Sequence, residues 1–484
     1  MKLGDLLAGT EAVLSRGDPD TDITGLCLDS RKVGAGDLFF ALPGAQADGQ
    51  RFIGQALAAG AAAVVAERAN RSAAPLVLVP DAHKALAEMA AAFYGHPAKQ
   101  LRMFGITGTN GKTTVTHILK GILERTRDER VGLIGTNAVR IGDKEWPAER
   151  TTPDALSLQA LLRDMVDAGC RACVMEVSSH ALAQHRTWGI QYSQAVFTNL
   201  TQDHLDYHKD MEDYFQAKRL LFLQADAAVL SLDDPYGRRL AESKAFNAVT
   251  YSAGRDEADV TAKNIRFKPD RVEFEAVTHS EIARIEWATP GAFSVSNALA
   301  AVTAALVAGL TLKSIAAAIR EVPPVKGRME TVPVPGGATV LIDYAHTPDA
   351  LTNLLSAVRS YHDGRVLTLF GCGGDRDRAK RPLMAAAASP DSDLLIVTSD
   401  NPRSEQPQKI IEDILAGLPA DAPPVIVEEN REEAIGIALR EARPGDVVLL
   451  CGKGHEDYQE IGGQKRHMDE REIVAAYLPL IGTK

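Results

Sequence analysis

The stretch that decides the fold reads MFGITGTNGKTT and runs from Met103 to Thr114. Its apolar start predicts a buried strand, and the apolar side chains that recur from Val115 to Leu123 predict a helix. Between them lies a loop rich in glycine and threonine. Such a loop is typical of a phosphate site, because backbone N–H groups and the helix N-terminus face the anion. The sequence therefore predicts an α/β domain that binds a nucleotide.

This loop is shorter than the common spacing G-x-x-x-x-G-K-[ST], because Ile106 occupies the position of the first glycine. We expect Lys112 to neutralise phosphate charge and Thr113 to offer its hydroxyl to Mg²⁺. The alternative is an ordinary junction of strand, turn and helix, which the adjacent glycine, lysine and threonines disfavour.

Beyond the loop, the sequence alone leaves the roles of three residues open. Glu176 ends an apolar, strand-like run and is either a ligand of Mg²⁺ or an ordinary strand-end carboxylate. His204 follows a second predicted strand and is either a metal ligand or a capping side chain, and its spacing alone favours the cap. Lys218 lies on a predicted helix, and its spacing alone favours a lysine exposed to solvent.

The C-terminal third alternates predicted strands with helices, which implies a parallel sheet covered by helices on both faces. The predicted strands are 339–342, 365–370, 393–398 and 447–450, and the polar or glycine-rich segments that follow them are 343–346, 371–376, 400–403 and 452–456. Because ligands bind beyond the carboxyl ends of parallel strands, we expect the four segments to form one binding rim. Ordinary loop polarity would explain any one segment, but it explains all four together poorly.

The composition is that of a globular protein, with 45% hydrophobic and 24% charged residues. A length of 484 residues favours three domains. Runs with glycine or proline, which interrupt helices and strands, occur at Tyr94–Pro97 and Val322–Pro324. They predict domain boundaries that give domains at 1–97, 98–324 and 325–484. The net charge of −11 disfavours binding to nucleic acid or to an anionic membrane, because like charges repel.

The five cysteines do not make a disulfide framework and fit a reduced, cytoplasmic protein. Cys170 and Cys173 form one C-x-x-C pair, which we interpret as core packing rather than a zinc or redox site. No apolar run is long enough to span a membrane.

These motifs together resemble the Mur ligase family, ATP-dependent amide ligases of peptidoglycan precursor synthesis. The matching segments extend over nearly the whole chain and are 108–114, 151–153, 176–180, 198–204, 291–297, 327–328 and 343–348. Two more, 371–381 and 400–403, resemble the family member that adds a diamino acid, meso-2,6-diaminopimelate. Ser294 departs from the family pattern, in which many members carry asparagine, and this matters little if Asn297 holds the adenine.

The resemblance implies an α/β fold with the three-domain Mur ligase architecture. Residues 1–97 would bind the UDP-sugar nucleotide, 98–324 would form the central P-loop ATPase domain, and 325–484 would form the Rossmann-like domain that brings the amino acid. The implied substrates are ATP, UDP-N-acetylmuramoyl-L-Ala-D-Glu and meso-diaminopimelate, with Mg²⁺ as cofactor. We expect a cytoplasmic monomer.

The resemblance also implies roles for individual residues. ATP would be bound by Gly108, Thr109, Asn110, Gly111, Lys112, Thr113, Thr114, Asn297, Arg328 and Asp343. The UDP-sugar dipeptide would be held by Ser30, Gln46, Thr151, Thr152, Ser178, Gln184 and Arg186. Diaminopimelate would be held by Arg376, Asp400, Asn401, Pro402, Arg403, Gly452 and Glu456. The implied catalytic residues are Lys112, Glu176, His204 and Lys218, and the implied ligands of Mg²⁺ are Thr113, Glu176, His204 and Lys218, the last as a carbamylated lysine.

The implied reaction first transfers the γ-phosphoryl group of ATP to the D-Glu side-chain carboxylate. The amine of the amino acid then attacks the acyl phosphate, and His346 is a weak candidate for the base that takes the amine's proton. Arg403 would select diaminopimelate, because its guanidinium matches the second carboxylate, unless it caps the loop or forms a surface ion pair with Glu405.

Three alternatives stay open. The first is the same ligase adding L-lysine or another amino acid, and the second is a folylpolyglutamate-type ligase. The long N-terminal zone and the segment 400–403 argue against the second. The third is a nucleotide-binding module without chemistry, which predicts damage to Lys112, Thr113, Glu176 or Lys218, and all four are present.

Overall fold

The computed structural model describes residues 1–44, 48–70, 75–142, 144–268, 270–334 and 337–481. The chain divides into two compact units, each assembled from several segments. The first unit contains Met1–Thr107, Glu129–Ala195 and Ala217–Asp226, and the second contains Gly108–Asp128, Val196–Gln216 and Ala227–Lys484.

The first unit begins with a five-stranded sheet in the order β1-β5-β4-β3-β2. Its strands are β1 (Val13–Arg16), β2 (Gly25–Cys27), β3 (Asp37–Phe40), β4 (Ala63–Ala66) and β5 (Leu76–Leu78). Strands β2 to β5 are parallel, and β1 is antiparallel to β5. Apolar side chains cover both faces. The helices are α1 (Leu3–Leu7), α2 (Ile53–Ala58) and α3 (Ala82–Phe93), with 3₁₀ turns at Gly49–Phe52 and Pro97–Gln100.

A second group of strands in the first unit includes the strand that precedes the nucleotide loop. In it β10 (Ala172–Glu176) pairs in parallel with both β6 (Arg102–Thr107) and β7 (Val131–Ile134). The remaining elements are β8 (Ala138–Ile141), β9 (Lys144–Pro147), α5 (Ala155–Asp167), α6 (Ser179–Ala183) and a 3₁₀ turn at Phe222–Gln224. Cys170 and Cys173 are buried thiols that are not joined in a disulfide, which confirms that this C-x-x-C pair packs in the core.

Three elements run across the division between the units, namely β11 (Tyr192–Phe197), α7 (Met211–Arg219) and β12 (Ala225–Ser231). In the second unit β12 pairs in parallel with β13 (Ala248–Ser252), which pairs in parallel with β14 (Val260–Phe267). The next two strands, β15 (Val272–Val277) and β16 (Ile282–Trp287), are added by antiparallel pairing. The helices here are α4 (Lys112–Arg127), α8 (Pro235–Glu242), α9 (Ala292–Val307) and α10 (Leu312–Arg320). The predicted helix after the phosphate loop is confirmed, because Val115, Ile118, Leu119, Ile122 and Leu123 are all buried.

The C-terminal sheet has the order β17-β18-β22-β19-β20-β21. Its strands are β17 (Glu330–Pro333), β18 (Thr339–Asp343), β19 (Val366–Phe370), β20 (Leu394–Val397), β21 (Val425–Val427) and β22 (Val447–Cys451), all parallel except β17. A hairpin of β23 (Tyr458–Ile461) and β24 (Gln464–His467) follows.

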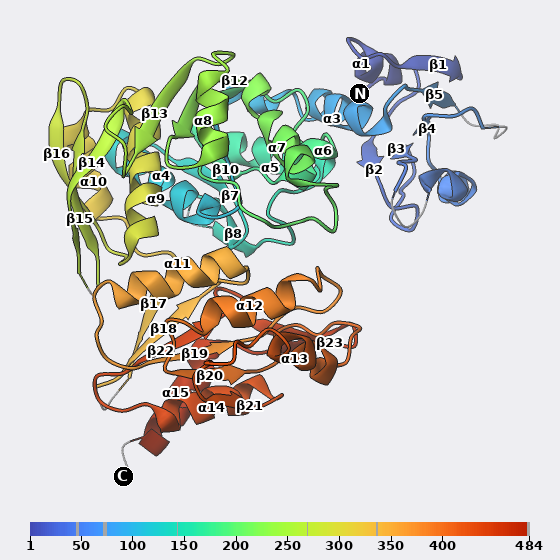
Figure 1. The fold of residues 1–484 in the computed structure, drawn as a ribbon. Helices are drawn as coiled ribbons and strands as arrows, with labels where there is room; N and C mark the ends of the chain where they lie inside the picture. The colour runs from blue at the N-terminus through green and yellow to red at the C-terminus, as the bar shows by residue number, and fades with distance from the viewer. Residues whose placement is uncertain (45–47, 71–74, 143, 269, 335–336, 482–484) are drawn as a thin grey trace. The chain divides into compact units, whose positions relative to one another are not determined.

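Helices cover both faces of this sheet, as its alternating pattern predicts. Figure 1 shows α11 (Pro348–Arg359) and α12 (Lys380–Ala388) on one side, and α14 (Arg431–Glu441) and α15 (Glu470–Ile481) on the other. Each side has its own apolar core, and α13 (Pro407–Leu415) joins the first.

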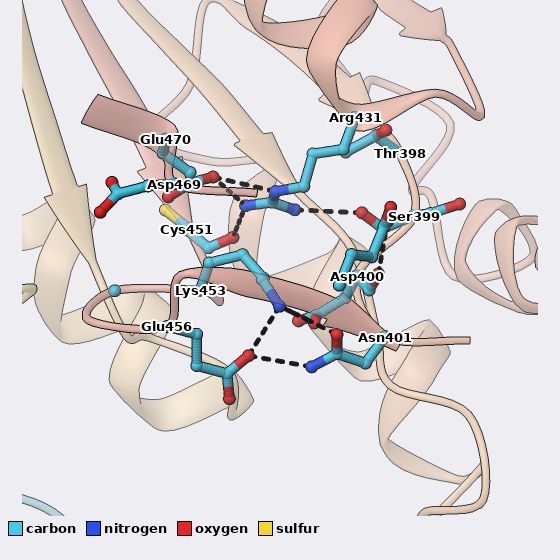
Figure 2. A network of polar contacts seen from close by, with 12 residues as sticks. Thr398, Ser399, Asp400, Asn401, Arg431, Cys451, Lys453, Glu456, Asp469 and Glu470 are labelled. Carbon is cyan, nitrogen blue, oxygen red and sulfur yellow. Dashed lines mark hydrogen bonds and ion pairs between the residues drawn. The ribbon is translucent and has the colours of Figure 1, made fainter. Parts of the chain in front are cut away.

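Arg431, at the start of α14, clamps two ends of this sheet (Figure 2). Its guanidinium is fully buried and donates to Glu470 Oε1 at 2.9 Å, to the Cys451 carbonyl at 2.7 Å and to the Ser399 carbonyl at 3.3 Å. Burial opposes its charge, but the carboxylates of Glu470 and Asp400 raise the pKa of Arg431 overall. The guanidinium therefore stays charged and ties the ends of β20 and β22 to α15.

We expect Arg431→Met to lower the free energy of unfolding by about 3–5 kcal/mol, because it leaves the Glu470 carboxylate buried without its cation. Urea unfolding measures this. Arg440→Met, at the exposed end of the same helix, is the matched control and should change stability little. The double variant Arg431→Met/Glu470→Gln should recover part of the loss. A single variant as stable as the control would contradict the assignment.

Candidate active site

The phosphate loop depends on two glycines with left-handed backbone. Gly108 has φ +151° and Gly111 has φ +85°. A Cβ atom at Gly108 would collide with the Thr198 hydroxyl, and one at Gly111 would collide with the Asn297 amide. Because Gly111 is also the N-cap of α4, no cap side chain covers the N–H groups of the first helical turn. Those groups and the helix dipole make this end of α4 suitable for an anion.

The loop is also held from outside. Asn199 accepts from the Asn110 N–H through its side chain and from the Thr109 N–H through its backbone carbonyl, both at 2.9 Å. The Lys112 ammonium donates to the carbonyls of Gly108 and Thr109, each at 2.9 Å. The cation is therefore fixed over the loop, where phosphate charge would arrive.

A cavity of about 240 Å³ opens beside the loop. Seven of the ten predicted ATP residues line it, namely Asn110, Gly111, Thr113, Thr114, Asn297, Arg328 and Asp343. Apolar walls come from Phe293 and Leu354. The structure thus brings together residues that lie more than two hundred positions apart in the sequence, and their role as ATP ligands stays a prediction.

Arg328 and Asp343 carry the charge on the far wall of this cavity. Arg328 donates to the Thr113 hydroxyl at 3.1 Å and lies over the ring of Tyr344, 4.8 Å from its centroid. Asp343 accepts from the N–H groups of Met329 at 2.7 Å and Ala345 at 2.8 Å. Burial raises the pKa of Asp343, and the neighbouring Arg328 works against that rise.

His346 lines the same cavity in a form suited to accept a proton. Its Nδ1 lies 2.8 Å from the Tyr344 carbonyl, which can only accept, so Nδ1 carries the hydrogen and Nε2 is the acceptor. Burial, and then the nearby Lys380, lower the pKa of His346. A neutral imidazole in this cavity is consistent with the suggestion that His346 is the base.

Sequence reasoning missed Asp349, which bonds directly to the phosphate loop. Its Oδ2 accepts from the Asn110 amide at 3.0 Å and from the Thr201 hydroxyl at 3.3 Å. Thr347 and Pro348 mark the start of α11, where Thr347 caps the Ala350 N–H. That local signal places Asp349 in a first helical turn, but it contains nothing about a partner 239 residues away.

Five of the seven predicted dipeptide residues form one hydrogen-bonded cluster around Glu176, namely Thr151, Thr152, Ser178, Gln184 and Arg186. Both oxygens of this buried carboxylate accept from Thr136, from its N–H at 2.8 Å and from its hydroxyl at 3.0 Å. The Thr136 hydroxyl also lies 3.0 Å from that of Thr151. Thr136 is a further residue that the sequence did not reveal.

The remaining members join through Thr152. Its hydroxyl donates to the Glu176 carbonyl at 2.9 Å and accepts from the Ser178 N–H at 3.0 Å. Arg186 donates to the Thr152 carbonyl at 2.9 Å and to Gln184 Oε1 at 2.6 Å.

Two predicted ligands of the UDP-sugar dipeptide are not part of this cluster. Ser30 lines a separate cavity of about 560 Å³ and donates to Gln55 Oε1 at 3.0 Å. Gln46 lies outside the described residues.

The four predicted strand ends of the C-terminal sheet do form one rim. The Gly452 N–H donates to the Asp343 carbonyl at 3.0 Å, and the Gly374 N–H donates to the Asn401 carbonyl at 2.9 Å. Asn401 donates from its side chain to Glu456 Oε2 at 2.9 Å (Figure 2). Arg376 lies on the exposed side of this rim and donates to the Asp375 carbonyl at 2.9 Å.

Arg403 does not pair with Glu405, so the ion-pair interpretation is wrong, whereas its contact with the Gly374 carbonyl fits the alternative that Arg403 caps the loop. Glu405 instead accepts from Arg378 at 2.8 Å and from the buried Arg381 at 2.8 Å. Arg403 donates from Nη1 to the Gly374 carbonyl at 2.8 Å, and its Nε lies 3.4 Å from Glu460. Within the described part of the chain its Nη2 has no protein partner, which leaves one edge of the guanidinium for a ligand.

Three models of one family match successive segments of the chain. "Mur ligase family, catalytic domain" matches residues 22–94, "Mur ligase middle domain" matches 106–305, and "Mur ligase, glutamate ligase domain" matches 327–454. A protein of Geobacillus kaustophilus, named UDP-N-acetylmuramoyl-L-alanyl-D-glutamate–2,6-diaminopimelate ligase, is 46% identical over 98% of this chain and 99% of its own length. The chain belongs to the Mur ligase family.

Other comparisons agree with this assignment. A protein of Gloeobacter violaceus with the same name is 48% identical, over 98% of this Mur ligase and 97% of its own length. A solved structure that carries this name superposes with a TM-score of 0.71 at 32% identity, with 100% of both chains covered. The predicted α/β fold and three-domain architecture are therefore confirmed, and the Mur ligase is an ATP-dependent ligase. The boundaries at 97 and 324 stay predictions.

The predicted metal ligands of this Mur ligase are divided between the two units. Glu176 and Lys218 lie in the first unit, and Thr113 and His204 lie in the second. Lys218 is only 1% exposed, so the interpretation as a solvent-exposed lysine is wrong. The His204 ring lies 3.4 Å from Asp203, and its backbone carbonyl accepts from Tyr207 and His208 to form a turn. Among the described residues, no three His, Cys, Asp or Glu side chains are grouped as a metal site.

In the described part of the Mur ligase, no helix is both long and apolar enough to cross a membrane.

Proposed function

We propose that this protein adds meso-2,6-diaminopimelate to UDP-N-acetylmuramoyl-L-Ala-D-Glu, with ATP as co-substrate, in peptidoglycan precursor synthesis. The observation that carries the proposal is the 46–48% identity, over 98% of the chain, to relatives named for this reaction. The loop 400–403, whose side chains lie on the rim of the C-terminal sheet, supports the choice of amino acid. A cytoplasmic location and a monomeric state are part of the same proposal.

The reaction needs two steps because a carboxylate is a poor electrophile. In the first step the D-Glu side-chain carboxylate attacks the γ-phosphorus, the bond to the β-phosphate oxygen breaks, and ADP leaves. In the second step the amine attacks the acyl carbon, and inorganic phosphate leaves from the tetrahedral intermediate. The amine must lose a proton, and His346 Nε2 is our candidate to take it.

This chain's own residues stabilise the charge that moves in the first step. The Lys112 ammonium lies over the loop carbonyls, and the first turn of α4 presents its N–H groups to the phosphates. Such preorganised donors supply most of the catalysis in phosphoryl transfer. Arg328, which bonds to Thr113, would add a second cation on the cavity wall.

The residue types that we propose as ligands, taken in each unit by itself, suit Mg²⁺. Thr113 and Glu176 supply a hydroxyl and a carboxylate, both buried, and hard oxygen ligands suit this ion. His204 and a carbamylated Lys218 complete the proposed set. The ion would offset negative charge on the phosphates.

The proposal that Lys218 is carbamylated follows the family resemblance, and Lys218 is a buried residue of α7. Carbon dioxide converts the amine into a carbamate, which is an anionic oxygen ligand instead of a cation. The change would turn this buried position on α7 into one that attracts Mg²⁺.

We expect ATP turnover to be coupled to both other substrates. ADP and phosphate should form only when the UDP-dipeptide is present, at full rate only with diaminopimelate, because binding must bring the reacting groups together before chemistry occurs. A phosphate-release assay with a panel of diamino acids measures this. Lys112→Ala is the low-activity control, with kcat lower by about 10²-fold or more. Rapid ATP hydrolysis without added substrate would sink the proposal.

We expect Lys218 to carry a carbamate. With ¹³C-labelled bicarbonate, the wild type should show a carbamate carbon in its NMR spectrum that Lys218→Ala lacks. Lys209→Ala, which changes the exposed lysine that precedes α7 in the sequence, should keep the signal. Activity of Lys218→Ala should return in part with added short carboxylates, since these replace the lost oxygen ligand. A fully active wild type without the signal would argue against the modification.

We expect Arg403 to select diaminopimelate over L-lysine. Lysine lacks the second carboxylate and would leave the guanidinium edge without a partner, and discrimination of this kind reaches about 10⁴-fold. Arg403→Ala should therefore raise KM for diaminopimelate strongly and leave KM for ATP unchanged.

The comparison needs kcat/KM for both amino acids in each variant. Arg378→Ala removes an exposed arginine from a neighbouring loop and is the matched control. If the ratio of diaminopimelate to lysine is the same in Arg403→Ala as in the wild type, Arg403 is not the selector.

A further inference from the structure

Lys453 lies behind the rim of the C-terminal sheet, and sequence reasoning did not single it out. Its side chain is fully buried. Figure 2 shows its ammonium between two side chains of the rim, 2.9 Å from Asn401 Oδ1 and 2.6 Å from Glu456 Oε2. Asp400 Oδ1 is 3.9 Å away. All three of these partners belong to the predicted diaminopimelate site, although Lys453 itself is too deep to reach a ligand.

These contacts fix the amide of Asn401 in one orientation. Its Oδ1 accepts from Lys453 and also from the Glu460 N–H at 2.9 Å, while its Nδ2 donates to Glu456 Oε2 at 2.9 Å. The same Glu456 oxygen accepts from Lys453, so three side chains form a closed triangle. Neither Asn401 nor Glu456 is free to rotate while the ammonium is in place.

The ammonium also sets the charge of the site. Asp400 and Glu456 are two carboxylates in a largely buried cluster, and without a cation they would repel each other. Lys453 offsets one of these two carboxylates. The other remains to face the ammonium end of a diamino acid.

We propose that Lys453 is the positioning residue of the amino-acid site. It holds Asn401 and Glu456 in the geometry that receives the distal end of the diamino acid, without touching that substrate. The inference rests on the proposed function and adds to it a residue that determines how well the amino acid binds.

The test compares Lys453→Met with Lys465→Met in the full-length enzyme. Both lysines lie over the ring of Tyr458, at 5.0 Å and 4.2 Å from its centroid, but Lys465 stands on the exposed hairpin strand β24. Lys453→Met should raise KM for diaminopimelate by about 10²-fold, because small displacements of binding groups have effects of that size. KM for ATP should stay unchanged in both variants. Urea unfolding reports whether each variant is folded.

If Lys453→Met does not fold, a second pair of variants tests the same inference. Lys453→Met/Glu456→Gln leaves neither Lys453 nor Glu456 as a buried unpaired charge, and it is compared with Glu456→Gln alone. The double variant should have the higher KM for diaminopimelate, since Asn401 has then lost its ammonium donor. Equal KM values in this pair, or in the folded Lys453→Met and Lys465→Met, would overturn the inference.

Failure of the proposed function is seen separately, in the wild type. If wild-type enzyme turns over only with another diamino acid, the proposed substrate is wrong. The Lys453 comparison is then made with that amino acid, and the same outcomes decide it.

Discussion

A cation buried away from water must be surrounded by oxygen atoms, and two of the buried cations of the C-terminal part lie at the carboxyl edge of its sheet. Arg431 draws the carbonyl ends of β20 and β22 toward Glu470. Lys453 donates to both Asn401 and Glu456, two side chains of the rim, and so holds them together. Because the parallel strands end at this edge, the two cations help to position the segments 400–403 and 452–456 of the proposed amino-acid site. Neither cation has to contact a substrate to do so.

The nucleotide loop differs from these cation sites, because it must leave backbone N–H donors available to bind phosphate. Glycine at 108 and 111 lets the backbone turn its N–H groups outward, and side chains from distant segments hold the loop in that shape. Asn199 comes from the segment after β11, and Asp349 comes from the first turn of α11. The loop and the C-terminal sheet are thereby joined through Asn110. A movement of α11 would therefore displace Asn110 of the phosphate loop.

Local signals predicted the elements well, because strand and helix patterns depend on neighbouring residues. The four predicted C-terminal strands agree with β18, β19, β20 and β22 to within two residues. The partners of charged side chains were not predictable in this way. Lys218 is buried, Arg403 pairs with Glu460 and not Glu405, and Asp349 reaches the loop. Each of these depends on tertiary packing, which spacing along the chain does not encode.

The hairpin of β23 and β24 has a bearing on protein engineering. Arg403 donates its N–H to the Glu460 carbonyl at 3.0 Å, and its own carbonyl accepts from Gly462 at 2.7 Å. The backbone of Arg403, at φ +52°, is thus in register with a second, distant segment. An attempt to transplant a different amino-acid preference into this scaffold should exchange loop 400–403 and hairpin 458–467 as one cassette. A graft of the loop alone would separate the arginine from the strand that aims it.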